Sequence, residues 1–326
     1  MNLNLTKITF ITLMLFSSMM TMSSSNWLTM WMGLELNLFS IIPILNFKTS
    51  IYSIESTMKY FLIQAFASII LLMFLINKSL FFMIQINMLM IMPLLMKMSL
   101  MPFHLWLPSM IEGLNWMCCF LLMTWQKIAP MIMISYLNLN KTLIFTIILI
   151  SMNNMFGINQ NSIRKILAMS SINNSSWMLM MILFNENLWI NYFLIYSILN
   201  LLIISILKSY QINYVNQLKF FNFNFFFKLN LLMLIFSIMG IPPMMGFLMK
   251  WMLIKTLIYN NMIIIMILLI SLTILNLMFY LKLIYFLLFN FNLSNKWYFQ
   301  NKMSNNNNIM LFFNFFSLFF SHFFFY

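Results

Sequence analysis

The stretch GIPPMMGFLMKW at residues 240–251 places two prolines and two glycines inside an apolar run. An earlier stretch, PLLMKMSLMPFH at residues 93–104, interrupts another apolar run with two prolines. Proline removes a backbone donor and clashes with the preceding turn, so both helices are predicted to unwind. Each stretch also carries a lysine, Lys97 in the earlier one and Lys250 in the later one. Unwound backbone at membrane depth is tolerated only inside protein or beside a wet cavity, which predicts an ion path.

The whole chain is far more apolar than a water-soluble domain. Its 326 residues are 63% hydrophobic and 6% charged, with a mean hydropathy of +0.94. Soluble domains are about 45–50% apolar and about 25% charged. An all-α polytopic membrane protein with about 11 transmembrane helices is therefore predicted. The expected spans are about 3–22, 26–45, 57–76, 81–101, 114–136, 142–157, 164–184, 188–207, 230–253, 261–289 and 309–325.

The two interrupted runs are the fourth and the ninth, so they lie five spans apart. A unit of five helices starts and ends on opposite sides of the membrane, so two consecutive units have inverted topology. Interruptions at matching positions of two halves point to the ion site in transporter folds. We predict one transmembrane domain over 1–326, with repeat one at about 1–138, repeat two at about 139–290 and a C-terminal helix and tail at about 291–326.

The net charge of +13 comes from thinly spread Lys and Arg, which favours a role in membrane orientation over nucleic-acid binding. The N-terminal side and the loops on the same face would hold Lys7, Lys48, Lys59, Arg164, Lys165, Lys208, Lys219, Lys228, Lys296 and Lys302. The opposite face would hold Lys78, Lys141 and Lys255. Basic residues accumulate on the inner side, so the N-terminus is predicted in the matrix of a mitochondrion and the C-terminus in the intermembrane space.

Amino-acid usage favours a mitochondrial gene. The chain has 38 Met and 37 Phe but only 5 Gly. Residues with AT-rich codons are abundant and those with GC-rich codons are scarce. The excess of Met fits a genetic code in which ATA also encodes Met, as in animal mitochondria.

Four charged residues lie inside apolar runs: Glu35, Lys97, Lys127 and Lys250. A charge at the bilayer centre costs about 2.5–3.5 kcal/mol on insertion scales, so such residues mark ion or proton paths. Lys127 lies too deep for its side chain to reach an interface easily, whereas Lys97 and Lys250 could be interfacial lysines at span ends. Glu35 could be a neutral buried carboxyl or half of a Glu–Lys pair that holds and releases a proton. We predict a proton relay through these four residues.

Other ionisable residues have competing interpretations. Glu55 and Lys59, four residues apart, are predicted to form an interfacial salt bridge. His104 follows the first interruption, where it could be a proton shuttle or a helix cap. Lys282 could belong to the relay or extend to an interface. His322, in the Phe-rich tail, is predicted to be incidental.

No cofactor or metal site is predicted in this chain. Five glycines leave no glycine-rich nucleotide fingerprint. Cys118 and Cys119 are adjacent, so they are poorly placed to pair, and two thiols are too few for a zinc or iron–sulfur site. Both are predicted to be small buried residues.

Six blocks of the chain together resemble one known family. They are WMGLELN (31–37), ESTMKYF (55–61), KMSLMPFHLW (97–106), TWQKIAP (124–130), RKILAMSSI (164–172) and GIPPMMGFLMKW (240–251). In this order they resemble the antiporter-like membrane-arm subunits of mitochondrial respiratory complex I, which are related to Mrp-type cation/proton antiporters. The likeness covers about residues 1–290, and the composition resembles that of an insect mitochondrial protein.

The resemblance implies a role in proton pumping coupled to NADH:ubiquinone electron transfer at the mitochondrial inner membrane. By motif, Glu35 and Lys97 would form an ion pair, Lys127 would be a central lysine and Lys250 the terminal lysine of the half-channel. Neighbouring antiporter-like and small membrane subunits, and lipids such as cardiolipin, would be partners. NADH, FMN, iron–sulfur clusters and ubiquinone would bind other subunits. Many relatives have a titrating His where this chain has Asn174, which puts any relay role there in doubt.

Two alternatives remain open at this point. A stand-alone cation/proton antiporter of the same fold would transport ions without a redox partner. A structural spacer would dock its neighbours and pump nothing, but it explains poorly why charges occur at membrane depth.

Overall fold

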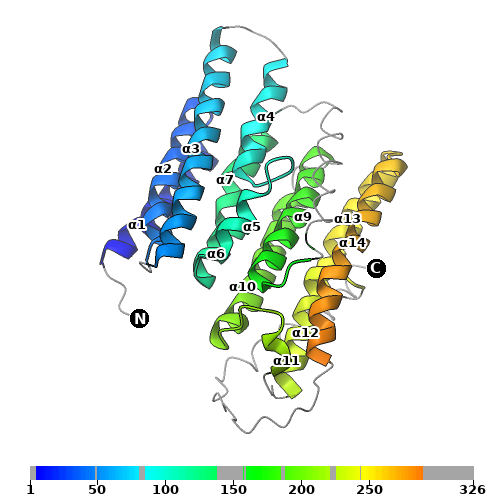
Figure 1. The fold of residues 1–326 in the computed structure, drawn as a ribbon. Helices are drawn as coiled ribbons and strands as arrows, with labels where there is room; N and C mark the ends of the chain where they lie inside the picture. The colour runs from blue at the N-terminus through cyan, green and yellow to red at the C-terminus, as the bar shows by residue number, and fades with distance from the viewer. Residues whose placement is uncertain are drawn as a thin grey trace. The chain divides into compact units, whose positions relative to one another are not determined.

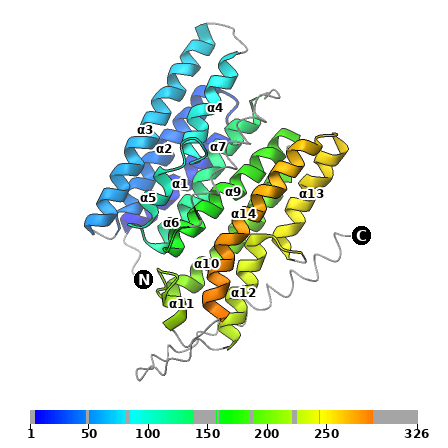
Figure 2. The same ribbon diagram turned by 45° about the vertical axis from the view of Figure 1, so that its right-hand side comes forward.

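A computed structural model describes residues 5–47, 50–80, 85–137, 157, 159–184, 188–220, 225–242 and 244–288. These residues are mainly helical, with an isolated antiparallel bridge between Ser162 and Tyr214 (Figures 1 and 2). The helices are α1 (Leu5–Ser23), α2 (Trp27–Leu45), α3 (Ile51–Leu80), α4 (Gln85–Lys97), α5 (Trp106–Ile111), α6 (Trp116–Met123), α7 (Trp125–Ser135), α9 (Ile163–Phe184), α10 (Leu188–Ser209), α11 (Gln217–Phe220), α12 (Phe225–Met239), α13 (Met245–Tyr259) and α14 (Ile263–Leu288).

Seven helical segments of the described residues are long and apolar enough to cross a membrane. They are Leu5–Ser23, Trp27–Leu45, Ile51–Lys78, Trp116–Ser135, Ile163–Phe184, Leu188–Ser209 and Ile263–Leu288. A helix satisfies its backbone hydrogen bonds internally, as a lipid environment requires. The expected helical membrane protein is therefore confirmed. The spans expected at about 142–157 and 309–325 lie outside the described residues, so the total of eleven spans stays a prediction.

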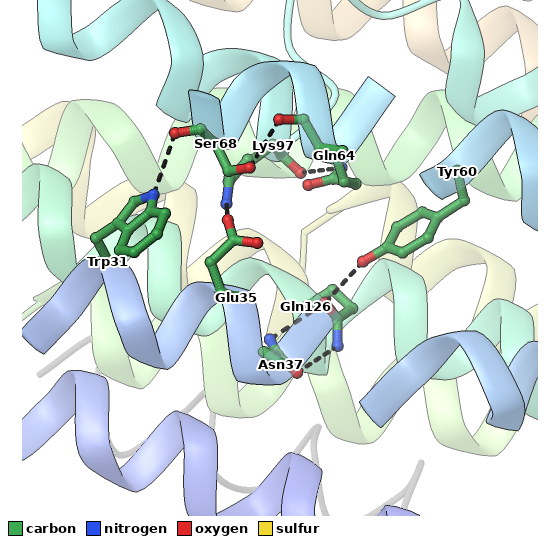
Figure 3. Close-up of polar contacts among 9 residues, drawn as sticks. Trp31, Glu35, Asn37, Tyr60, Gln64, Ser68, Lys97 and Gln126 are labelled. Carbon is green, nitrogen blue, oxygen red and sulfur yellow. Dashed lines mark hydrogen bonds and ion pairs between the residues drawn. The ribbon is translucent and has the colours of Figure 1, made fainter. Parts of the chain in front are cut away.

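Residues 1–153 and 171–186 form one compact unit. Within it, α1 packs along α2, and α3 contacts both α2 and α4. Helix α7 contacts the preceding helix α6 and also α1, α2 and α4, which are more distant in the sequence. Figure 3 looks into the polar region that these helices enclose. This unit therefore positions Glu35, Lys97 and Lys127.

Residues 154–170 and 187–326 form the second compact unit. Its helix α12 contacts α10, α13 and α14, and α13 and α14 also contact each other. The isolated bridge between Ser162 and Tyr214 joins the start of α9 to the segment after α10. Lys250 belongs to α13 in this unit. The proposed boundary between two repeats near residue 138 stays a prediction.

The span expected over about 114–136 is found as Trp116–Ser135, with one unpredicted irregularity inside it. Helices α6 and α7 meet at Thr124, whose φ is −118° and ψ is −77°. The Thr124 hydroxyl donates a hydrogen bond to the Phe120 carbonyl at 2.7 Å. Such hydroxyl-to-carbonyl bonds compete with regular helical bonding and often bend helices. Neither Gly nor Pro occupies position 124, so the sequence offered no strong signal for this discontinuity.

The short helices α5 and α11 also have no counterpart among the predicted spans. Helix α5 follows the end of α4 at Lys97 and the connecting residues 98–105. Helix α12 ends at Met239 and α13 begins at Met245, where one run is expected over about 230–253. The prolines and glycines of both stretches favour these helix ends.

Candidate functional site

The acidic residue Glu35 and the basic residue Lys97 lie beside each other in the first unit. Glu35 is on α2, and Lys97 is the last residue of α4. The Lys97 Nζ–Glu35 Oε1 distance is 4.0 Å, with side-chain exposures of 4% and 22% (Figure 3). This distance is the outer limit of an ion pair, longer than a charge-assisted hydrogen bond of about 2.7–2.9 Å. The two groups therefore sense each other's charge without a tight bond that would lock them together.

A network of neutral polar groups lies next to this pair (Figure 3). Asn37 on α2 and Gln126 on α7 form a reciprocal amide pair. Asn37 Nδ2 donates to Gln126 Oε1 at 3.2 Å, and Gln126 Nε2 donates to Asn37 Oδ1 at 2.9 Å. The Tyr60 hydroxyl on α3 donates to the same Gln126 Oε1 at 3.0 Å. Three helices are thus joined by hydrogen bonds inside the first unit.

The sequence analysis missed this network, although its members carry a weak signal. Asn37 lies two residues after Glu35, and Gln126 directly precedes Lys127. Each is a polar residue within an apolar span and beside a predicted site residue. Sequence alone did not show that Asn37 and Gln126, 89 positions apart, contact each other.

Lys127 is the most deeply buried of the four predicted relay residues, with 2% of its surface exposed. Its Nζ donates to the Ser171 backbone carbonyl at 2.8 Å and approaches the Ser175 hydroxyl at 3.5 Å. Both acceptors are on α9. Within the described part of the chain, these neutral oxygens are the partners of the ammonium, and no carboxylate lies within 4.0 Å of it. Lys127 is therefore buried without an ion-pair partner among the described residues.

The polar stretch of α9 that faces the protein interior includes Asn174, the position at which the sequence departs from the resembled family. Asn173, Asn174, Ser175 and Ser176 are all buried. The Ser175 hydroxyl can also donate its one proton to the carbonyl of Ser171 or of Ile172, which lie at 2.9 and 2.7 Å. Amide and hydroxyl groups thus line this part of α9, and the Ser175 hydroxyl lies 3.5 Å from Lys127 Nζ.

In the second unit, Lys250 is buried against the end of α12. Its Nζ donates to the Met239 carbonyl at 2.8 Å. Met239 is the last residue of α12, where helical carbonyls lack intrahelical partners and carry partial negative charge. Gly240, the next residue, has φ of +76°, and a Cβ there would lie 2.8 Å from Lys250 Nζ. The end of α12 thus packs closely against the Lys250 ammonium and accepts its hydrogen bond.

The structure also places the remaining candidates. His104 is buried, and its backbone carbonyl accepts the Leu107 amide at 3.3 Å at the start of α5. Lys59 and Glu55 are half-exposed and 2.6 Å apart, in agreement with the predicted salt bridge. Lys282 Nζ donates to the carbonyl of Gln160 at 3.1 Å and to Asn161 Oδ1 at 2.7 Å. His322 lies outside the described residues.

Both cysteines are buried thiols rather than a disulfide. Their side chains approach backbone carbonyls, Cys118 that of Ile44 at 3.5 Å and Cys119 that of Ile111 at 3.7 Å. Across the described ranges, no cluster of three or more His, Cys, Asp or Glu side chains could hold a metal ion.

Comparison with known proteins connects this site to a family. The family model described as NADH:quinone oxidoreductase/Mrp antiporter, transmembrane region, matches residues 24–77 and 74–276. A chain in the solved structure of respiratory complex I from Thermus thermophilus with bound aureothin has the same fold, with a TM-score of 0.84 at 18% identity. That likeness covers 98% of this chain and 78% of the other.

Two insect relatives are similar over nearly their whole length. NADH-ubiquinone oxidoreductase chain 2 of Anopheles gambiae is 41% identical over 322 residues, which cover 95% of this chain and 94% of the relative. The corresponding Aedes aegypti protein is 42% identical over 328 residues, with the same two coverages. The family model matches most of this chain, and both insect relatives are more than 40% identical to it. The chain therefore belongs to the NADH-ubiquinone oxidoreductase chain 2 family, whose fold is that of the antiporter-like membrane subunits of complex I.

Proposed function

We propose that this chain is a proton-translocating membrane-arm subunit of respiratory complex I. Its place would be the mitochondrial inner membrane, with other complex I subunits as partners and the redox cofactors bound elsewhere in the complex. The observation that carries the proposal is Lys127, which is buried inside the first unit and held by neutral oxygens, near the helices that carry the Glu35–Lys97 pair. Family membership supports the assignment to the complex.

The surroundings of Lys127 suit a group that gains and loses a proton. A carboxylate partner in direct contact would favour the charged ammonium permanently. The Ser171 carbonyl and the Ser175 hydroxyl instead accept hydrogen bonds from the charged form, and the hydroxyl can turn to donate to the neutral amine. Both protonation states therefore keep a hydrogen-bond partner, which lowers the cost of switching between them.

The proposed mechanism is electrostatic. While Glu35 is near Lys97, the carboxylate favours the charged lysine, and weakening of the pair favours release of the proton towards Lys127. The pair distance of 4.0 Å supports a contact that can be strengthened or weakened by small helix movements. Moving one charge against a membrane potential costs about 2.3 kcal/mol per 100 mV, which conformational work in the complex must supply.

Lys250 would serve as the corresponding terminal lysine in the second unit, and His104 would be a shuttle at the end of the first interruption. We also propose two inverted five-helix repeats, with the helix ends at Lys97 and Met239 at membrane depth. Two observations support this arrangement: a lysine lies beside each of the two helix ends, and the matching family model also describes Mrp antiporters. The N-terminus would face the matrix and the C-terminus the intermembrane space, in line with the distribution of basic residues.

The test is Lys127→Met in the intact complex, because Met has a similar length but carries no proton. Proton translocation per NADH oxidised should fall several-fold or be lost together with coupled turnover, while the complex still assembles. Translocation is followed by quenching of a pH-sensitive dye in vesicles, and assembly by a native gel stained for NADH dehydrogenase activity. An assembled Lys127→Met complex that pumps at the normal ratio would contradict the assigned role.

The same native gel separates this proposal from a stand-alone antiporter. Peptides of this chain should co-migrate with the active complex I band when detected by mass spectrometry. Their occurrence only in a small band without NADH dehydrogenase activity would favour the antiporter, which would exchange cations for protons without a redox partner.

A further inference from the structure

Two consecutive residues of helix α7, Gln126 and Lys127, bond to different helices of the first unit. Gln126 bonds to α2 and α3 through Asn37 and Tyr60. Lys127, the next residue, bonds to α9 through the Ser171 carbonyl. Successive residues of a helix point about 100° apart, so one turn of α7 faces both the polar network and the buried ammonium site. A movement of α2 that shifts Gln126 must therefore also shift Lys127.

The amide pair is well suited to transmit such a movement. Each of the two side chains donates to and accepts from the other, which fixes their relative orientation as well as their separation. Asn37 is buried on the same helix as Glu35, two residues further along. All the groups in the network are neutral, so it adds no charge that would compete with the Glu35–Lys97 pair. Tyr60 supplies a second donor to Gln126 Oε1 and restricts its rotation.

We propose that Asn37 and Gln126 are positioning residues that couple the Glu35–Lys97 pair to Lys127, with Tyr60 holding the Gln126 amide in place. Opening or closing of the ion pair moves α2, the amide pair carries this movement to the first turn of α7, and the Lys127 ammonium shifts relative to its acceptors on α9. This inference rests on the proposed proton-pumping function. It adds a mechanical link between two groups that the relay otherwise connects only by charge.

The test uses Asn37→Leu and Gln126→Met, two changes that keep the side-chain size and remove the hydrogen bonds. The ratio of protons translocated to NADH oxidised is measured in vesicles that hold the whole complex. We expect each variant to lower this ratio by about threefold or more, the shift in equilibrium that one average interhelical hydrogen bond in a membrane supports. The exchange variant Asn37→Gln/Gln126→Asn rebuilds an amide pair of the same total length, and it should recover most of the ratio.

Thr57→Val is the matched control, because it removes another interhelical contact of the same unit. The Thr57 hydroxyl donates to Asn46 Oδ1 at 2.9 Å, just beyond the end of α2, and its hydrogen bonds do not involve Asn37, Gln126 or Lys127. We expect Thr57→Val to lower thermal stability about as much as Asn37→Leu but to leave the pumping ratio normal. If Asn37→Leu and Gln126→Met also pump at the normal ratio, or if the exchange variant pumps no better than they do, the inference is wrong.

Two further variants keep the outcome interpretable. Tyr60→Phe removes only one hydroxyl, so it replaces Asn37→Leu and Gln126→Met as the test if those variants fail to assemble. It should lower the ratio of protons translocated to NADH oxidised by a smaller factor than they do. A normal ratio for Tyr60→Phe in that case would overturn the link. Lys127→Met is measured in parallel. If Lys127→Met loses pumping and the network variants do not, only this inference fails, whereas normal pumping by Lys127→Met removes the proposed function itself.

Discussion

The four charged residues proposed for the relay have two kinds of partner. Glu35 and Lys97 share a loose ion pair, whereas Lys127 and Lys250 donate to backbone carbonyls at 2.8 Å. A carbonyl stabilises an ammonium by a hydrogen bond but cannot cancel its charge. Within the described residues, no carboxylate fixes the charge of Lys127, which suits the proposed relay better than a purely structural role.

Gly33 on α2 allows the close approach of α1. A Cβ at this position would lie 2.5 Å from Thr21 Cγ2 and 3.1 Å from the Ser17 carbonyl oxygen. Thr21 cannot turn away freely, because its hydroxyl donates to Ser18 at 2.7 Å. Gly33→Ala should therefore lower the free energy of unfolding by about 1–3 kcal/mol, the usual cost of overpacking.

Thermal unfolding of the complex in detergent, followed through this subunit, measures the effect. Thr21→Ser removes the methyl group that would collide and keeps the hydroxyl, so Gly33→Ala/Thr21→Ser should regain part of the loss. A Gly33→Ala chain as stable as the natural one would show that α1 and α2 are not packed as tightly as the structure indicates.

At the scale of elements, the ends of α4 and α12 contribute to two of the lysine sites. Helix α4 ends at Lys97, and α12 ends where its last carbonyl receives the Lys250 ammonium. Gly246 brings α13 against α12, because a Cβ there would overlap the Ser237 carbonyl. The end of α12 thus supplies a backbone acceptor for the Lys250 ammonium that an apolar helix surface could not.

Gly240→Ala tests the junction between α12 and α13. Its φ of +76° disfavours any residue with a Cβ, and that Cβ would also lie 2.8 Å from Lys250 Nζ. The strain should cost about 1–2 kcal/mol of stability. Displacement of the ammonium should in addition lower the number of protons moved per NADH, measured in vesicles.

Asn261→Ala is the control for backbone strain alone. Asn261 has φ of 58° in the connection between α13 and α14, and it is exposed. This variant should lose stability and keep its pumping ratio. Equal pumping ratios for the Gly240→Ala and Asn261→Ala complexes would argue against a role in pumping for the contact between Lys250 and the end of α12.

At the scale of the whole molecule, basic residues and apolar spans define the expected topology. The family membership and the seven candidate spans are established, while the orientation follows from the predicted loops. A chain with an odd number of spans has its termini on opposite sides. The topology therefore predicts different protease sensitivities for the two ends.

Protease protection in mitochondria stripped of their outer membrane checks this orientation. Antibodies against the two terminal peptides should show that added protease digests the C-terminus and leaves the N-terminus intact. Digestion of the N-terminus instead would reverse the orientation, and digestion of both ends would require an even number of spans.

Much of the helical architecture was predictable from the sequence, because apolar length and proline act locally. The runs expected at about 164–184, 188–207 and 261–289 correspond to α9, α10 and α14 within a few residues. The positions of the buried charges were predictable for the same reason, since a charge inside an apolar run is visible without knowledge of its neighbours. The discontinuity at Thr124 was not, because it depends on how the hydroxyl bonds to the preceding turn.

What the sequence by itself determined was most of the apolar helices of the described region, the interruptions near Lys97 and Lys250, and the placement of four charged residues inside apolar runs. Only the tertiary structure decided which groups those residues meet. Lys127 reaches a carbonyl 44 positions away, and Gln126 pairs with an amide 89 positions away. The physical reason is that hydropathy and backbone strain are local properties of the chain, whereas hydrogen-bond partners between helices depend on how distant segments pack.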